Sequence, residues 1–216
     1  MSLWHSDPPQ FFLGLDLGQS KDYTALTIIE RIETNGGDVV VQQVRHLQRW
    51  KLRTSYPTIV REVTAMLNQP PLRHADTTLA IDGTGVGRPV VDLFWNVKTD
   101  ALIRPVQIVA GSKESHNDGF YHVPKRELVS LVQVALQTRQ LRIAAELPEA
   151  EVLVKELINF QVKITDAAND TYGAWREGQH DDLVLATALA LWASEKGGGR
   201  AEHGPSLDAL VNNRWG

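Results

Sequence analysis

Acidic residues at the ends of apolar segments are the part of this sequence best suited to chemistry. Asp16 ends the run FFLGLD, Asp82 ends TLAID, and Asp181 and Asp182 precede LVLATALALW. A carboxylate beside apolar surface costs free energy unless its charge is compensated, and carboxylates gathered at one place repel one another unless a cation lies between them. The pattern predicts a metal-dependent enzyme that acts on phosphates, with a nuclease as the first candidate.

Each of these residues also fits an ordinary structural role. Asp16 and Asp82 lie next to glycine-bearing turns, where aspartate is common, and an aspartate before an apolar helix is often its N-cap. Their joint placement, and no single residue, favours the functional interpretation. Three other aspartates are interpreted as surface or turn residues: Asp22, Asp92 and Asp166.

The elements that must position these residues begin with three short strands. Segments 11–17, 24–30 and 39–47 are apolar and rich in β-forming residues, and Asn35-Gly36-Gly37 is a strong turn signal between the last two. They predict an antiparallel meander. Strand–helix–strand units follow it, so the fold expected is α/β, with a mixed sheet of antiparallel and parallel strands flanked by helices.

Helical spacing marks the first element after the meander. Val60, Val63, Thr64 and Leu67 recur on one helical face, and Pro70-Pro71 ends that helix. The remaining elements expected are strands at 77–81 and 102–109, helices at 89–95, 123–137 and 149–158, a late hairpin from 160–164 and 171–175, and a last helix that opens at Asp181.

The expected fold can bring the acidic residues together. In open α/β sheets the site lies beyond the carboxyl ends of the parallel strands. Asp82 stands at such an end, and Asp16 becomes its neighbour if the first strand pairs with the fourth, a pairing that the sequence leaves open. A helix that begins at Asp181 would add its carboxylates from one side.

Composition limits the class of protein. The chain of 216 residues fits one large domain, which we expect at 11–196 between an N-terminal tail at 1–10 and a linker and C-terminal tail at 197–216. The absence of cysteine excludes disulfides, zinc–thiolate sites and thiol nucleophiles. The apolar stretch 183–193 is shorter than a membrane span, and the N-terminus has no signal-peptide pattern. The net charge of −4 argues against a general polyanion binder, although a local basic face could hold DNA.

Basic residues gather in two segments. Those within 45–53 surround Trp50 and are interpreted as a solvated face. The second segment runs from Lys113 to Arg126, and its polar part, 111–122, predicts a mobile loop or hairpin able to close over a DNA backbone. Lys113, Lys125 and Arg126 are the candidate phosphate contacts, which give affinity without sequence specificity.

Three of these motifs together resemble a known family. LGLDLGQSKDYTAL, AIDGTGVGRPVVDLF and HDDLVLATALALW, in this order, are similar to the nuclease domain of phage terminase large subunits, from about Phe11 to Ala193. RWKLRTSYPTIVREV and HVPKRELVSLVQVALQTRQLRI add to the similarity. The resemblance implies the ribonuclease H-like fold, shared with Holliday-junction resolvases. It also implies a DNA endonuclease encoded by a phage or prophage and acting in the cytoplasm of the bacterial host cell.

The resemblance and metal chemistry together assign roles to the residues. Two Mg²⁺ or Mn²⁺ ions about 4 Å apart can activate water and stabilise the leaving oxygen in phosphodiester cleavage. Asp16 would bridge both ions, Asp82 would hold one, and Asp181 or Asp182 the other. His180 would orient a water molecule or the scissile phosphate.

One departure from the family leaves alternatives open. The sequence has no G-x-x-x-x-G-K-[ST] phosphate loop of the ATPase motor that large terminases carry, so motor domain, small terminase subunit and portal are expected partners only if the chain belongs to a packaging machine. The alternatives are a fragment of an actin-like ATPase or sugar kinase, disfavoured by length, and a non-catalytic module for DNA binding or packaging assembly. RNA as a substrate stays open.

Overall fold

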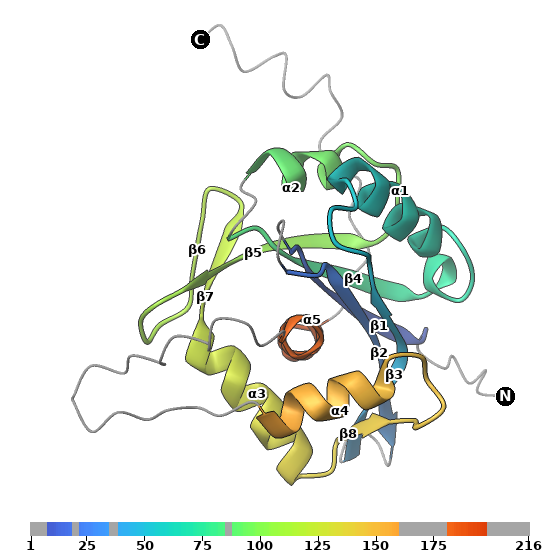
Figure 1. Ribbon diagram of the computed structural model, residues 1–216, viewed down its shortest axis with the longest axis vertical. Helices are drawn as coiled ribbons and strands as arrows, with labels where there is room; N and C mark the ends of the chain where they lie inside the picture. The colour runs from blue at the N-terminus through green and yellow to red at the C-terminus, as the bar shows by residue number, and fades with distance from the viewer. Residues whose placement is uncertain (1–7, 19–21, 35–38, 85–87, 160–180, 198–216) are drawn as a thin grey trace, which may run out of the picture.

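The protein was analysed as a computed structural model, which describes residues 8–18, 22–34, 39–84, 88–159 and 181–197 (Figure 1). The expected late hairpin at 160–164 and 171–175 and the candidate residue His180 lie outside the described residues.

A mixed sheet with the strand order β6-β7-β5-β4-β1-β2-β3-β8 forms the centre of the described part. The first three strands make the expected antiparallel meander, and β1 pairs with β4 in parallel, which is the pairing that brings Asp16 beside Asp82. β5 and β7 continue the parallel part. The strands are β1 (Gln10–Asp16), β2 (Ala25–Thr34), β3 (Val39–Arg49), β4 (Asp76–Asp82), β5 (Leu102–Val109), β6 (Ser115–Asn117), β7 (Phe120–Pro124) and β8 (Leu141–Ile143).

Helices cover both faces of this sheet. In Figure 1, α1 and α2 lie on one side of the sheet, while α5 is seen end-on on the other side with α3 and α4 beyond it. The helices are α1 (Tyr56–Leu67), α2 (Arg88–Trp95), α3 (Lys125–Gln137), α4 (Ala150–Asn159) and α5 (Asp182–Glu195), with a short 3-10 turn at Leu72–His74. The expected α/β fold class is confirmed.

The segment between β5 and α3 differs from the expectation in one respect. The hairpin alternative for 111–122 is right, because β6 and β7 pair antiparallel there. The expected helix start at Val123 is wrong: Val123 and Pro124 end β7, and α3 begins at Lys125. Val123 is buried and Pro124 has extended backbone angles, so β7 continues through both residues before the helix begins.

Alternation along β1 separates the two cores of the protein. Phe11, Leu13 and Leu15 pack in the core under α1 and α2, whereas Phe12 packs in the core that contains α5. Because successive side chains of a strand point to opposite faces, Gly14 and Asp16 face α5 as Phe12 does. The same alternation in β4 places Ala80 and Asp82 on the α5 side, because Leu79 and Ile81 belong to the other core.

Helix α5 packs directly on the backbone of β1. A Cβ atom on Gly14 would overlap the carbonyl oxygen of Ala186 and approach the amide nitrogen of Ala190 to 2.6 Å, so only glycine allows this approach. Twelve of the fourteen residues of α5 are buried, which makes it the central helix of this layer. A buried hydrogen bond of 3.1 Å between the Thr27 and Thr187 hydroxyls ties it to β2.

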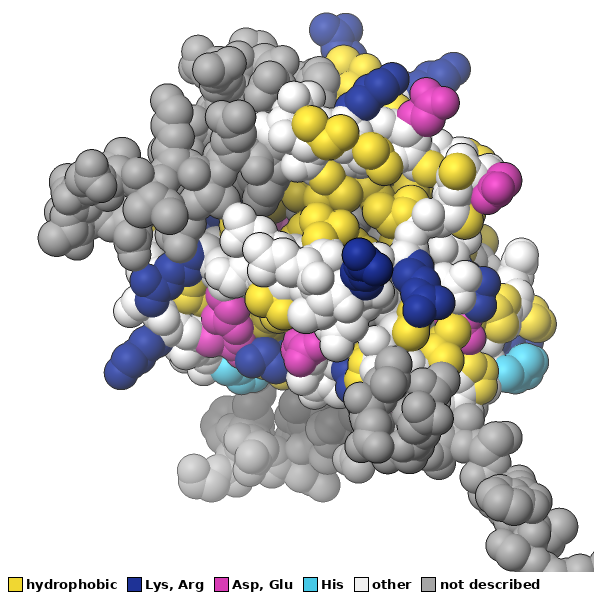
Figure 2. All heavy atoms as spheres, turned by 90° about the horizontal axis from the view of Figure 1, so that it is seen from below, with side chains coloured by type: hydrophobic (Ala, Val, Ile, Leu, Met, Phe, Trp, Pro, Cys, Tyr) yellow, Lys and Arg dark blue, Asp and Glu magenta, His cyan; other side chains and the backbone are white. Residues whose placement is uncertain are grey.

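The face seen from below in Figure 2 carries an apolar area with Lys and Arg side chains dispersed around it. α3 and α4 contribute exposed apolar side chains: Val134, Leu136, Val154 and Ile158. Among the described residues, no helix combines the length and the apolar character that crossing a membrane requires.

Candidate active site

Two acidic residues of the site end adjacent parallel strands. Leu15 of β1 pairs with Ile81 of β4, so Asp16 and Asp82 follow side by side at the carboxyl edge, by which we mean the edge where β1, β4, β5 and β7 end. Both face α5 by the alternation described above. Asp16 is only 8% exposed and Asp82 is half-buried.

Asp82 also makes the turn that its sequence suggested. Its Oδ1 atom accepts a 2.8 Å hydrogen bond from the backbone N–H of Thr84. The Thr84 hydroxyl in turn accepts a 2.7 Å hydrogen bond from the Ile108 amide of β5. The structural and functional interpretations of Asp82 are therefore compatible, because the turn fixes the carboxylate at the strand end.

The start of α5 brings the second pair of carboxylates to the same place. Asp181 is half-buried at the N-cap position, and Asp182, the first helical residue, is 3% exposed. The Asp181 side chain makes no capping hydrogen bond, contrary to its ordinary role. Capping is done instead by Glu156 of α4, whose Oε2 atom accepts hydrogen bonds from the Leu183 and Val184 amides at 3.0 and 3.2 Å.

Electrostatics shows that these carboxylates act on one another. Burial raises the pKa of Asp16 well above its ordinary value, and the charges of Asp82, Asp182, Asp181 and Asp22 raise it further. Burial also raises the pKa of Asp82, against the opposing effects of its hydrogen bonds with Thr84 and the charge of Lys125. The ionised forms of these carboxylates are therefore disfavoured in this poorly hydrated place, and a bound cation would compensate their charge.

Lys125 belongs to this acidic cluster. It opens α3 directly after β7 and is half-buried. Burial lowers its pKa to about 8, although the charges of Asp181, Asp16 and Asp82 favour its protonated form. The ammonium group thus lies among the carboxylates, where it neutralises part of their charge.

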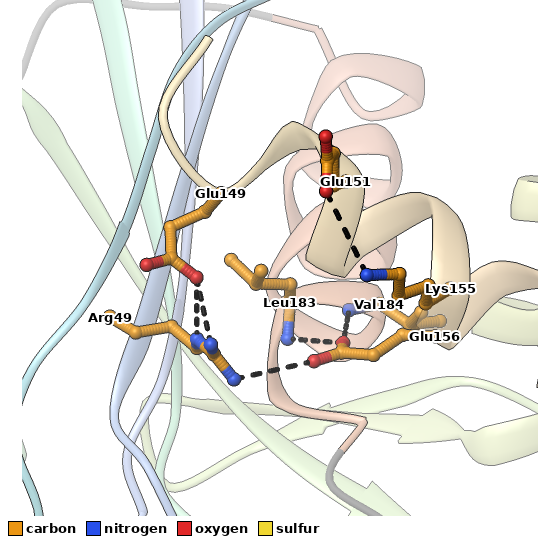
Figure 3. A network of polar contacts seen from close by, with 7 residues as sticks. All are labelled: Arg49, Glu149, Glu151, Lys155, Glu156, Leu183 and Val184. Atoms are coloured by element: carbon orange, nitrogen blue, oxygen red, sulfur yellow. Dashed lines mark hydrogen bonds and ion pairs between the residues drawn. The ribbon is translucent and has the colours of Figure 1, made fainter. Parts of the chain in front are cut away.

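A network of polar contacts supports the α5 end of the cluster (Figure 3). Arg49, the last residue of β3, binds Glu149 at 2.8 Å and lies 3.9 Å from Glu156 Oε1. Its guanidinium also lies over the ring of Tyr23, 4.9 Å from the centroid. Arg49 therefore links the start of β2, the end of β3 and the capping residue of α5.

The donor atoms of the site suit a hard divalent cation. Its four acidic side chains offer oxygen ligands alone, which Mg²⁺ and Mn²⁺ prefer. Within the described residues no group of three or more His, Asp or Glu side chains is arranged to hold a metal ion as it stands. The residues fit a metal by type and mutual proximity, and full coordination would need side-chain rotation or water ligands.

The remaining candidates are placed less centrally. Arg126 donates a 3.0 Å hydrogen bond to the Ser112 carbonyl, so it braces the segment before the β6–β7 hairpin. Lys113 is exposed in that segment, and in the described part of the chain no contact joins it to the acidic residues. Asp22 is exposed in the turn before β2, as expected, and Asp92 is half-buried on α2.

Two supporting residues were not identified from sequence as part of the site. Glu156 follows the buried residue Leu153 by three positions on α4 and is itself 8% exposed. A carboxylate on the buried face of a helix signals a partner, although only the fold shows which one. Arg49 was assigned to a solvated basic face, but it is half-buried and paired.

Comparisons with known proteins agree with this architecture. The profile of the Terminase RNaseH-like domain matches residues 13–193. A comparison with curated protein sequences gave no match. The fold is similar to the large terminase nuclease from thermophilic phage G20c, with 18% identity and a TM-score of 0.53 over 84% of this chain and 81% of that one. It is also similar to the Mn-soaked, inhibitor-bound human cytomegalovirus terminase nuclease domain, with 12% identity and a TM-score of 0.54 over 90% and 86% of the two chains.

Proposed function

This chain belongs to the terminase RNase H-like domain family, and from that membership we propose that it is a divalent-metal-dependent endonuclease that cleaves DNA phosphodiester bonds. The observation that carries the proposal is the placement of Asp16 and Asp82 at the ends of adjacent parallel strands, with Asp181 and Asp182 at the start of the helix packed on β1. The raised pKa of Asp16, to which burial and the charges of the other three contribute, supports their proximity. The relatives of similar fold support the proposal, since both are terminase nucleases and one was soaked with Mn.

The four carboxylates would divide the binding of two Mg²⁺ or Mn²⁺ ions. Asp16, which all the others influence, would bridge both, while Asp82 would hold one and Asp181 or Asp182 the other. When bound, such ions would supply activation of water for attack and neutralisation of the charge on the departing oxygen. The protein contributes the poorly hydrated setting and the fixed positions of the acidic side chains.

Lys125 would contact the substrate in this arrangement. Its ammonium group lies among the carboxylates and is only half-buried, so it can reach a non-bridging phosphate oxygen. A positive charge fixed beside the scissile phosphate stabilises the negative charge that develops in the transition state. Lys113 and Arg126 would add phosphate contacts at the β6–β7 hairpin, and His180 would orient the water or the phosphate.

Family membership also supports a biological setting. A phage or prophage terminase nuclease would act on DNA in the cytoplasm of the bacterial host cell. An ATPase motor domain, a small terminase subunit and the portal would be its partners in a packaging machine. The domain would occupy residues 11–196, which contain the matched range 13–193.

Plasmid cleavage tests the proposal. The protein is incubated with supercoiled plasmid in Mg²⁺, in Mn²⁺ and in EDTA, beside an Asp16→Ala variant and an Asp100→Ala control whose carboxylate is exposed near the start of β5. We expect metal-dependent nicking or linearisation by the wild type and the control, and none by Asp16→Ala. Cleavage retained by the Asp16→Ala variant would refute the assigned site. A folded wild-type protein that cleaves under no condition would instead favour the non-catalytic packaging module.

A further inference from the structure

Positive charge flanks the acidic centre on the side opposite to Lys125. Asp16 of β1 pairs with Ala25 of β2, and Ala25 pairs with Arg49, so β3 ends at the same edge as β1. The chain leaves β3 there and reaches Lys51 two residues later. Two strand spacings separate β1 from β3, which amounts to about 10 Å.

A pocket of about 430 Å³ opens at this place. Lys51 and Arg53 line it together with Thr54 and Tyr56. Gly18, two residues after Asp16, also lines the pocket, and Asp22 is the one acidic residue among its described lining residues. The pocket therefore adjoins the segment that carries Asp16, and two positive charges outnumber one negative charge.

The basic residues of this segment fall into two groups. Arg45 and Arg49 are neutralised, by Glu30 at 2.6 Å and by Glu149 at 2.8 Å. Lys51 and Arg53 are exposed, and neither side chain makes a hydrogen bond or ion pair with another described residue. The expected solvated face is therefore seen at Lys51 and Arg53, whose exposed charges line the pocket, and not at Arg49, which is half-buried and paired.

The backbone that presents these two residues is fixed. Trp50 is buried, its amide donates to Thr24 O at 2.9 Å, and its indole N–H donates to Glu62 at 2.6 Å. The carbonyl oxygen of Lys51 accepts hydrogen bonds from both the amide and the hydroxyl of Thr54, at 3.1 and 2.7 Å. Little conformational entropy is therefore lost in the backbone when a ligand binds.

We propose that the Lys51–Arg53 pocket binds a backbone phosphate of the DNA strand whose neighbouring phosphodiester lies at the acidic centre. The four carboxylates repel a polyanion, and the whole chain has a net charge of −4. Cations on both sides of the centre, Lys125 beyond β5 and Lys51 with Arg53 beyond β2, offset that repulsion and set the direction of the strand across the sheet edge. The identity of the ligand rests on the proposed nuclease function.

The test compares two double variants of equal charge. Lys51→Gln with Arg53→Gln removes the pocket cations. Arg73→Gln with Lys98→Gln removes two exposed cations that precede β4 and β5, at the opposite edge of the sheet. Binding of a labelled duplex is measured by fluorescence anisotropy in EDTA, so that cleavage does not interfere, at salt concentrations between about 50 and 200 mM.

We expect the pocket variant to bind about tenfold more weakly at low salt, and its slope of log Kd against log salt to fall by about one, because the contact with one backbone phosphate is lost. The control variant should bind as the wild type does. Equal affinities and slopes for the two variants overturn the proposal, and so does a wild-type protein that does not bind DNA. Plasmid cleavage tests the nuclease function separately. If the protein binds DNA through the Lys51–Arg53 pocket but never cleaves it, the phosphate site stands and the proposed nuclease function is refuted.

Discussion

Asp16 lies in an environment very different from that of a solvated aspartate. Burial and the neighbouring carboxylates raise its pKa in the folded protein, so its ionised form is less stable there than in the unfolded chain. Without divalent metal, the stability present at low pH is lost as the pH rises through this raised pKa.

An Asp16→Asn variant should therefore melt at a higher temperature than the wild type at pH 7 in EDTA, because it removes the repelled charge while keeping the shape. The same variant should lose metal-dependent cleavage. Thermal unfolding and plasmid assays measure the two effects, and a variant that melts at a lower temperature in EDTA contradicts the electrostatic account.

Glu156 provides a second titration, with a position on the pH scale. Burial raises its pKa from 4.5 to about 7, against the hydrogen bonds from Val184 and Leu183 and the charge of Arg49. The protonated carboxyl of Glu156 contributes to the stability of the fold. This contribution is complete below the pKa of Glu156 in the unfolded chain and is lost as the pH rises through about 7. We expect the metal-free wild type to lose free energy of unfolding between about pH 5 and 8, and Glu156→Gln to flatten this decline. Urea unfolding at each pH measures it; identical profiles would show that Glu156 does not titrate there.

At the scale of elements, the contact between α5 and β1 decides the geometry of the site. Because Gly14 lets the helix backbone touch the strand, the start of α5 reaches the end of β1. Gly14→Ala should destabilise the protein by about 1–3 kcal/mol, as overpacked cores do, and should reduce cleavage because Asp181 and Asp182 move away from Asp16. Chemical denaturation and plasmid cleavage check both effects, and wild-type values for both would contradict this role of Gly14.

The network around Arg49 is the second device that fixes α5. Arg49→Met removes the guanidinium that joins Glu149 and Glu156, whereas Arg45→Met, on the same strand, removes a pair with Glu30 in which Arg45 is exposed. We expect Arg45→Met to lower the free energy of unfolding by no more than the roughly 0–1 kcal/mol of an exposed pair. Arg49→Met should lower the free energy of unfolding by more than that. The kcat of cleavage should fall for Arg49→Met alone. Equal effects of the two substitutions would remove Arg49 from the support of the site.

Sequence reasoning succeeded where the pattern is local. The apolar, β-forming run FFLGLD identifies β1, and the apolar run after Asp182 identifies α5. It failed where the partner is distant. The capping of α5 by Glu156 joins residues 27 positions apart. The placement of Lys125 depends on where β7 ends, and the polar sequence of the hairpin did not indicate that end. The pairing of β1 with β4 is also set by packing, and local propensity does not determine it.

For the whole molecule, the distribution of charge matters more than its sum. A protein of net charge −4 holds a polyanion only through cations placed along the path of the strand. Lys125→Gln should reduce both DNA binding and the cleavage of bound DNA, because its ammonium lies among the carboxylates. Arg126→Gln should reduce binding alone. Anisotropy in EDTA and single-turnover cleavage at saturating DNA separate the two quantities, and equal cleavage rates for both variants would contradict a role of Lys125 at the scissile phosphate.

The position of α5 in the chain has a consequence for biosynthesis. This helix fills the centre of one layer, yet it is the last described element to leave the ribosome. A nascent chain that has been translated only as far as α4 holds Asp16 and Asp82 but neither Asp181 nor Asp182, and it lacks the α5 side chains that complete the core with Phe12 of β1. If the four carboxylates form the proposed active site, synthesis itself delays its assembly, and an unfinished polypeptide does not hold the complete acidic cluster.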